Sequence, residues 1–209
     1  VVDAAGDGWP IKLATGADFT MQPAWHPAGE WIAWVESDHP NMPWDGTRVM
    51  LGRFSPAGPQ VQDARCIAGD AGTPAWQPQF SPDGRWLSTI VTGADWDRLV
   101  LRELAGGAER TLLEGERLLL ATPAWAQGQH TYGWSPDSRS IFSIRNYGGR
   151  ASLWQVRLDG SAEQIDTNPY TWLWQLSVSL AGKGLAFLAS APSVPDRVVR
   201  WDGSRLHVE

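Results

Sequence analysis

The sequence predicts an all-β chain made of repeated four-stranded sheets, and three observations support this prediction. A segment that reads as strand, tight turn and strand recurs along the chain. Its turns carry a proline followed by pairs such as Asp-Gly or Ala-Gly, which suit the backbone of a tight turn. The 209 residues include 14 Trp, 22 Gly and 15 Pro, a composition that favours aromatic strands joined by turns over helices.

The recurring segment aligns without gaps at three places, residues 24–35, 79–90 and 133–144. A fourth copy at residues 177–188 keeps the pattern but lacks the proline. The anchor residues Trp25, Phe80, Trp134 and Val178 follow one another at intervals of 55, 54 and 44 residues. Such a period is typical of the four-stranded blade of a β-propeller.

Two further strands follow each copy of the segment. We expect the third strands at residues 48–54, 98–104, 151–158 and 197–201, and short fourth strands such as 162–166 and 205–208. Residues 109–120 are the best candidate for a helix, but they read as easily as a strand and a loop. The expected blades are therefore residues 22–68, 74–113, 122–166 and 173–209.

The first 14 residues resemble the end of a preceding blade. Residues 1–3 read as the end of a third strand, a glycine-rich turn reaches Gly8, and residues 10–13 read as a fourth strand. We therefore expect one partial propeller over residues 1–209: four blades and a partial leading blade, cut from a larger, seven-bladed propeller. A chain complete in itself would instead form a compact four-bladed ring. Open blade edges predict pairing into a homo-oligomer.

Charge and composition exclude several classes of partner. A net charge of -6 and a pI near 5.2 leave no basic surface for nucleic acid. Cys66 is the only cysteine, which excludes an intramolecular disulfide and sites built from several cysteines. No run of 18 apolar residues predicts a membrane span, and residues 1–10 lack the pattern of a signal peptide. We expect a cytoplasmic location.

A polar loop in the first blade is one candidate for contact with a ligand or with an adjoining domain. It carries Asp38, His39, Trp44 and Asp45 between the expected second and third strands. Two carboxylates and an imidazole are also ligands that a metal accepts, but we expect no metal. The alternative is an ordered loop that is stiffened by its prolines, with Trp44 as a packing anchor.

The first strand of the third blade supplies the second candidate, His130 with Tyr132. Both residues would line the central channel, because the first strands of blades face the propeller axis. The alternative is a buried histidine that is hydrogen-bonded to the backbone.

We expect no catalytic residue and no cofactor in this chain. The only G-x-S triplet is Gly133-Trp134-Ser135, and its serine belongs to a repeat turn rather than to the G-x-S-x-G elbow of a hydrolase. Asp83 and Asp137 are expected to cap their own turns.

Most of the tryptophans are expected in the core between blades. The residues at strand positions of the repeat are Trp25, Trp31, Trp34, Trp86, Trp134 and Trp154. The candidates for the surface, which lie in expected loops, are Trp9, Trp44, Trp96 and Trp172.

The repeat resembles the PD40 repeat of TolB-like propellers, which are related to WD40 propellers. Longer stretches are more specific: residues 38–47 (DHPNMPWDGT), 122–134 (TPAWAQGQHTYGW) and 168–202 resemble, in this order, segments of bacterial acylaminoacyl-peptidase-like serine peptidases. These enzymes belong to the prolyl oligopeptidase family, peptidase family S9. The resemblance covers essentially the whole chain.

This resemblance implies an N-terminal propeller followed by a C-terminal α/β-hydrolase domain, which carries the Ser, Asp and His of proteolysis and is absent from these residues. The chain alone would be no enzyme. It would shield the hydrolase site and restrict entry to short peptide substrates. One alternative is a TolB-like scaffold that binds proteins or ligands. Another is an enzyme that uses the propeller itself, which would need converging acids or metal ligands on several blades; the sequence shows no such set.

Overall fold

The computed structural model describes residues 1–55, 58, 60–122, 128–182 and 184–209. All the regular secondary structure in these residues is β-strand, as predicted, and sixteen strands form four sheets. Over the same ranges, no helix has the length and apolar character needed to cross a bilayer. The Pro-x-Trp motif at residues 123–125, part of the family resemblance, lies outside the described residues.

Each sheet is an antiparallel meander whose strands pair in chain order. The first sheet contains β1 (Phe19–Trp25), β2 (Trp31–Ser37), β3 (Arg48–Ser55) and β4 (Gln60–Ala68). The second contains β5 (Ala75–Phe80), β6 (Trp86–Thr92), β7 (Asp97–Glu103) and β8 (Glu109–Leu113). The third contains β9 (Tyr132–Trp134), β10 (Ser140–Tyr147), β11 (Arg150–Arg157) and β12 (Ala162–Ile165). The fourth contains β13 (Trp172–Val178), β14 (Leu185–Ala191), β15 (Val194–Trp201) and β16 (Leu206–Val208).

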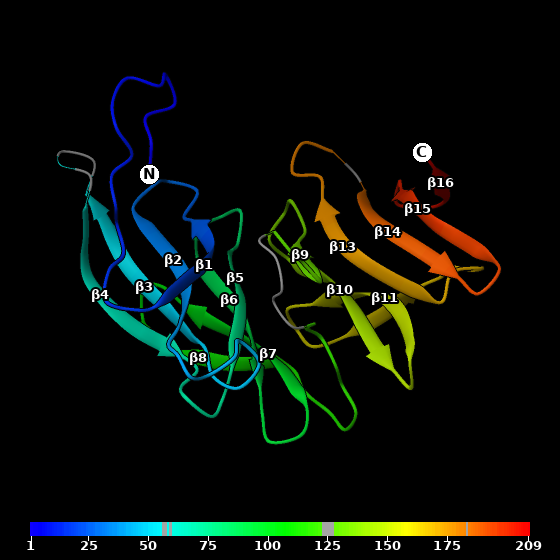
Figure 1. Cartoon of the computed structure of the whole chain (residues 1–209). Helices are drawn as coiled ribbons and strands as arrows, with labels where there is room; N and C mark the ends of the chain where they lie inside the picture. Colours follow the sequence, from blue (N-terminus) through cyan, green and yellow to red (C-terminus); the bar gives the residue numbers. More distant parts are fainter. Residues whose placement is uncertain (56–57, 59, 123–127, 183) are drawn as a thin grey trace.

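The four sheets follow one another along an arc, with their first strands on its inner side (Figure 1). The inner strand β1 contacts β5, β5 contacts β9, and β9 contacts β13. The outer strands β4 and β16 lie at opposite ends of the arc. This is the arrangement of consecutive propeller blades, so the predicted fold class is confirmed.

Apolar side chains on alternating strand positions form a core at each junction between sheets. Val35 and Val49 of the first sheet pack with Val91 and Val100 of the second. The next junction contains Ile90, Leu99, Tyr132, Trp134 and Ile141. The last contains, among others, Leu153, Leu173 and Phe187. Because the middle sheets are covered on both faces, their second strands are mostly buried.

The repeat turns also connect neighbouring sheets. Asp83 accepts hydrogen bonds from Ser81 Oγ (2.6 Å) and Arg85 N (3.0 Å), and Asp137 does the same in its own turn, so the predicted capping roles are confirmed. The ring of His26 reaches the next turn, where Nε2 lies 3.1 Å from the Gly84 carbonyl oxygen. Ala28 N donates to Nδ1, which leaves Nε2 as the donor to Gly84.

This contact between turns predicts different effects at two equivalent glycines. Gly29 and Gly84 have φ of 72° and 71°, but an added Cβ meets nothing at Gly29 and lies 2.5 Å from His26 Nε2 at Gly84. We expect Gly29→Ala to lower the free energy of unfolding by about 1 kcal/mol, the penalty of a left-handed backbone for alanine. Gly84→Ala should cost about 2 kcal/mol, because it also displaces the imidazole and breaks its hydrogen bond. Urea denaturation measures both.

A double variant provides the control for this pair. In a His26→Ala background, Gly84→Ala should cost no more than Gly29→Ala, because no ring then opposes the new methyl group. Equal costs of the two glycine variants in the wild-type background would contradict the proposed contact.

Residues 1–18 contain no assigned strand before β1 begins at Phe19. They are nevertheless held in a bend, because Val1 and Ile11 exchange two backbone hydrogen bonds. The Val1 amino group donates to Ile11 O (2.6 Å), and Ile11 N donates to Val1 O (2.7 Å). Whether this segment belongs to a preceding blade stays a prediction.

Candidate functional site: a groove along the inner strands

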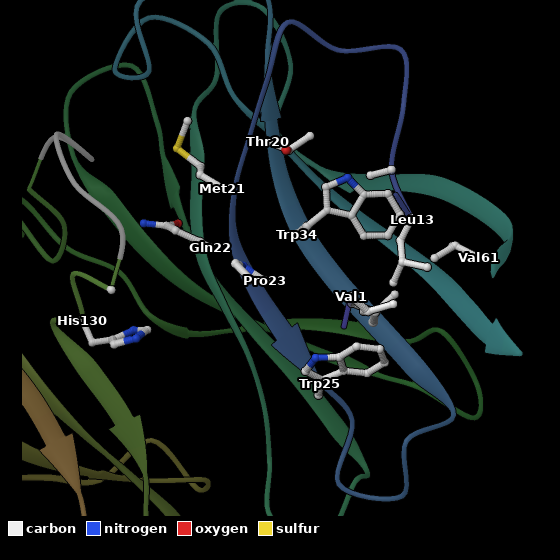
Figure 2. A pocket seen from close by; sticks show the side chains of 13 residues that line it. Val1, Leu13, Thr20, Met21, Gln22, Pro23, Trp25, Trp34, Val61 and His130 are labelled. Atoms are coloured by element: carbon white, nitrogen blue, oxygen red, sulfur yellow. The ribbon is translucent and has the colours of Figure 1, made fainter. Parts of the chain in front are cut away.

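A hollow lies against the inner strand of the first sheet (Figure 2). It has a volume of about 760 Å³ and is mostly apolar. Strand β1 contributes Thr20, Met21, Gln22, Pro23 and Trp25. Other parts of the wall come from Ile32 and Trp34 of β2, from Val1 and Leu13 of the N-terminal segment, and from His130 on the opposite side.

A second hollow of about 450 Å³ continues along the inner side of the arc. It shares Trp25 and His130 with the first hollow. Most of its other lining is apolar and comes from repeat turns and inner strands, including Pro27, Pro82 and Pro136. The two hollows together give the inner surface a long apolar groove with His130 near its middle.

The backbone of His130 is fixed by the fourth sheet. Its carbonyl accepts a hydrogen bond from Leu176 N (2.8 Å), and its N–H donates to Gln175 Oε1 (3.3 Å). Partial burial lowers the pKa of the imidazole. The groove therefore presents a neutral histidine at neutral pH, able both to donate and to accept a hydrogen bond.

Tyr132 also lines the second hollow, but its side chain is held within the core. The side chain is 1% exposed, its hydroxyl donates to Gln77 O (2.5 Å), and it lies 3.0 Å from Ser88 Oγ. Burial raises the pKa of this phenol far above its usual value. Tyr132 thus joins the second and third sheets, and the hydroxyl is already used within the core.

The buried phenol predicts a loss of stability in alkali. The unfolded chain ionises this tyrosine near pH 10, whereas the folded chain keeps it protonated, so its contribution is complete below about pH 10 and falls as the pH rises further. We expect Tyr132→Phe to be less stable than wild type by about 1 kcal/mol at pH 7, because the Gln77 carbonyl loses its donor. The difference should shrink above pH 10, as followed by urea denaturation at several pH values. A difference independent of pH would contradict this account.

The polar loop of the first blade is tied to its surroundings by its carboxylates. Asp38 accepts from Arg48 Nη2 (2.7 Å) and from Asp18 N (3.1 Å). The Arg48 guanidinium lowers the pKa of Asp38. The Asp18 carboxylate accepts a hydrogen bond from His39 N (2.9 Å). Within the loop, the Asp45 carboxylate accepts one from Met42 N (3.0 Å).

The other two loop residues are placed differently from each other. His39 is exposed, and Trp44 is half-buried against the core between the second and third sheets. None of the four predicted loop residues lines either hollow, so the structure does not bring them together with His130. Among the described residues, no group of three His, Cys, Asp or Glu side chains is placed to hold a metal ion. A contact of this loop with a ligand or domain stays a prediction.

One set of residues that the sequence analysis missed connects the inner strands. Gln22 and Gln77 occupy β-bulges at the same position of β1 and β5, both with φ of 50°. Gln22 Oε1 accepts from Gln77 N (2.7 Å), and Gln77 Oε1 accepts in turn from Thr131 N (2.8 Å) and Thr131 Oγ1 (3.2 Å). We call this series of bonds from sheet to sheet the glutamine relay.

The relay changes direction at the third sheet. Thr131 occupies the equivalent position there, and its side chain is too short to reach the next strand. Gln175 of the fourth sheet, with φ of 55°, points back and accepts from His130 N instead. The signal was present in the sequence as Met-Gln-Pro, Trp-Gln-Pro and Trp-Gln-Leu, directly before three of the aligned segments.

The prediction that Trp25 belongs to the core between blades is wrong. Trp25 is 44% exposed, whereas Phe80 and Trp134 at the equivalent positions are 9% and 3% exposed. The reason is that Phe80 and Trp134 lie against a preceding sheet, while Trp25 belongs to the first sheet. Of the predicted surface residues, Trp9, Trp96 and Trp172 are exposed.

Comparisons with known proteins agree with this architecture. No family model and no curated protein matches the chain. Among solved structures, a puromycin-hydrolysing peptidase of Mycobacterium tuberculosis is 26% identical, with a TM-score of 0.85 over 99% of this chain and 30% of that chain. TolB from Agrobacterium tumefaciens is 22% identical, with a TM-score of 0.71 over 99% of this chain and 71% of that chain. Prolyl oligopeptidase B from Galerina marginata is 8% identical, with a TM-score of 0.68 over 89% of this chain and 25% of that chain.

The structural neighbours of the chain are thus puromycin-hydrolysing peptidases, prolyl oligopeptidases and TolB propellers. This confirms the predicted resemblance to the propellers of S9 peptidases and of TolB. The chain spans about 30% of the length of the puromycin-hydrolysing peptidase.

Proposed function

We propose that this chain is a non-catalytic propeller region of an S9-family serine peptidase, which controls the access of peptides to a C-terminal α/β-hydrolase domain. One observation carries the proposal: similarity to a puromycin-hydrolysing peptidase extends over 99% of the chain at 26% identity, and the chain spans only 30% of that enzyme. The remaining length of such a protein has room for the hydrolase. The cytoplasm is the compartment we propose.

The inner groove supports a role in peptide access. Its walls are largely apolar, with Trp25 exposed in it and a neutral His130 near the middle. An extended short peptide can place apolar side chains on such a surface and its backbone against the imidazole. The glutamine relay fixes the inner strands of the first three sheets relative to one another. A folded protein substrate could therefore enter the groove only if these buried hydrogen bonds broke.

The serine of the only G-x-S triplet in the sequence, Ser135, is not placed for catalysis. Ser135 is 5% exposed, and its Oγ donates to Asp137 Oδ1 (2.7 Å). We therefore expect no labelling of the 209-residue chain by a fluorophosphonate probe, read on a gel beside Ser135→Ala. Labelling of either protein at a stoichiometric level would contradict a non-catalytic role.

The alternative is a TolB-like scaffold without a hydrolase partner, which shares the same fold. The reading frame downstream of the Glu209 codon separates the two functions. A G-x-S-x-G sequence followed by Asp and His supports the peptidase, and the encoded domain should then co-purify with this chain when both are expressed. A stop codon directly after Glu209 would support the scaffold and contradict the peptidase.

A further inference from the structure

The second hollow of the groove has an uncharged lining. None of the described residues that line it is Asp, Glu, Lys or Arg, although the chain carries 17 Lys and Arg and 23 Asp and Glu. Its titratable side chains are His130 and Tyr132, and the buried phenol of Tyr132 stays protonated at neutral pH. His130 is therefore the lining residue whose charge can change near neutral pH.

Apolar side chains at equivalent positions of the repeat run along this hollow. Pro27, Pro82 and Pro136 occupy the same position of the first three aligned segments, and Leu180 takes that position in the fourth. Leu180 is 70% exposed, and Trp25 of the first sheet, which lines the same hollow, is 44% exposed. Apolar groups of a ligand would gain free energy by covering this surface.

Two polar groups of the lining are free to bind a peptide backbone. His130 forms hydrogen bonds with Gln175 and Leu176 through its backbone, and its ring nitrogens have no partner among the described residues. Gln79 Nε2 donates to Tyr132 O (2.8 Å), while Oε1 of the same amide has no partner among those residues. A neutral imidazole offers one donor and one acceptor, and the amide oxygen offers a second acceptor. These groups match the N–H and C=O groups of a peptide.

The strands around His130 supply no opposite charge. Strands β1, β5, β9 and β13 contain no Asp, Glu, Lys or Arg, and neither do residues 128–131. Strand β10, which pairs with β9, carries Arg145. This guanidinium lies over the Trp154 ring, 4.4 Å from its centroid, and does not line the hollow.

The charged groups of the neighbouring turns and of the N-terminal segment are bound elsewhere. Asp83 and Asp137, which follow two of the lining prolines, accept hydrogen bonds within their own turns. The amino group of Val1, in the first hollow, donates to Ile11 O. A protonated His130 would thus have no counter-ion among the described residues, and burial accordingly lowers the pKa of this imidazole.

We propose that the second hollow binds peptide segments whose side chains are uncharged, and that protonation of His130 extends this selection to segments carrying one carboxylate. That the ligand is a peptide rests on the proposed function. At neutral pH, a charged side chain would lose its water in the hollow without gaining a partner. An imidazolium in the same place pairs with a carboxylate and repels an ammonium group.

Three peptides test this selection in the 209-residue chain. They share the sequence Ala-Leu-X-Leu-Ala with both ends blocked, and X is Gln, Glu or Lys. At about pH 8, the Gln peptide should bind about 10-fold more tightly than the Glu and the Lys peptides, measured by isothermal titration calorimetry.

The titration of His130, followed by NMR, tests the second part of the proposal in the same protein. The chain has four histidines, whose imidazole signals are assigned individually. With saturating Glu peptide, the pH of half-protonation of His130 should lie about one pH unit above its value with the Gln peptide, because binding and protonation are linked reciprocally. With the Lys peptide it should lie below that value.

Two variants separate His130 from the other histidines. His130→Gln keeps a neutral hydrogen-bonding side chain, so the Glu peptide should no longer bind more tightly as the pH falls below about 7, as it does in wild type. His39→Gln is the matched control, since His39 is exposed and lines neither hollow, and it should behave as wild type.

The outcomes distinguish this selection from the proposed function. Equal affinities of the three peptides at about pH 8, or the same pH of half-protonation in all three complexes, would overturn the charge selection and leave a role of the groove in peptide access standing. Binding of none of the three peptides would overturn both.

Discussion

Replacement of Gln77 by alanine is expected to lower the free energy of unfolding by about 3 kcal/mol, because it leaves buried polar groups of the third sheet without their acceptor. Gln77 is 2% exposed, and its Oε1 accepts from both the backbone and the hydroxyl of Thr131. Urea denaturation, followed by tryptophan fluorescence, measures the loss.

Two other glutamines provide matched controls for this variant. Gln22 and Gln175 occupy the same left-handed bulge position, with φ of 50° and 55° against 50° for Gln77, so the backbone penalty for alanine is alike at all three. Gln22→Ala removes the side-chain acceptor of the Gln77 N–H. Gln175→Ala removes the acceptor of the exposed His130 N–H, which lies 3.3 Å away. We expect losses of about 2 and about 1 kcal/mol. Equal losses at the three positions would show that backbone strain, and not the relay, sets the cost.

Replacement of Gly69 by alanine is expected to lower the free energy of unfolding by about 4 kcal/mol, which is the largest effect we predict. Gly69 has φ of 81° in the connection from β4 to β5. A Cβ there would lie 2.1 Å from Thr47 O and 2.8 Å from Ala75 Cβ. Thr47 and Ala75 are themselves hydrogen-bonded to each other across the first junction, so neither atom can move aside cheaply.

Gly107→Ala is the control for Gly69→Ala. Its φ is 69°, but an added Cβ meets nothing within 4 Å, so only the backbone penalty of about 1 kcal/mol applies. Thermal and urea unfolding of the two variants should differ widely. If they lose the same stability, the close approach of the first and second sheets at Gly69 is not as the structure shows it.

The strands and turns of this protein could be predicted because their signals are local. The Pro-Asp-Gly turn at residues 82–84 and the alternation after it involve neighbours in sequence, and β6 follows where the pattern places it. Third strands were located within one residue in three sheets, whereas β15 begins at Val194, three residues before the expected start. Pro195 and Asp196 disfavour a strand by propensity and lie where the register of β14 and β15 is irregular, but Val194 before them still pairs with Ala191 of β14.

The candidate site was predicted only in part. The sequence indicated that His130 and Tyr132 lie on an inner strand. Both line the second hollow, but only His130 also lines the first, and the Tyr132 side chain is buried against Ser88. Residues two positions apart point to the same side in a regular strand, but His130 precedes the three-residue strand β9, so this alternation does not extend to it. The relay of Gln22 and Gln77 was missed because its bonds join residues 55 positions apart.

Local sequence patterns specify the row of four-stranded blades, because a turn and an alternating strand pattern are set by residues close together in the chain. Which of the equivalent residues are buried depends on tertiary packing, as Trp25 and Phe80 show with exposures of 44% and 9%. A blade surface is buried by the sheet that packs over it, and that sheet is encoded about one repeat away.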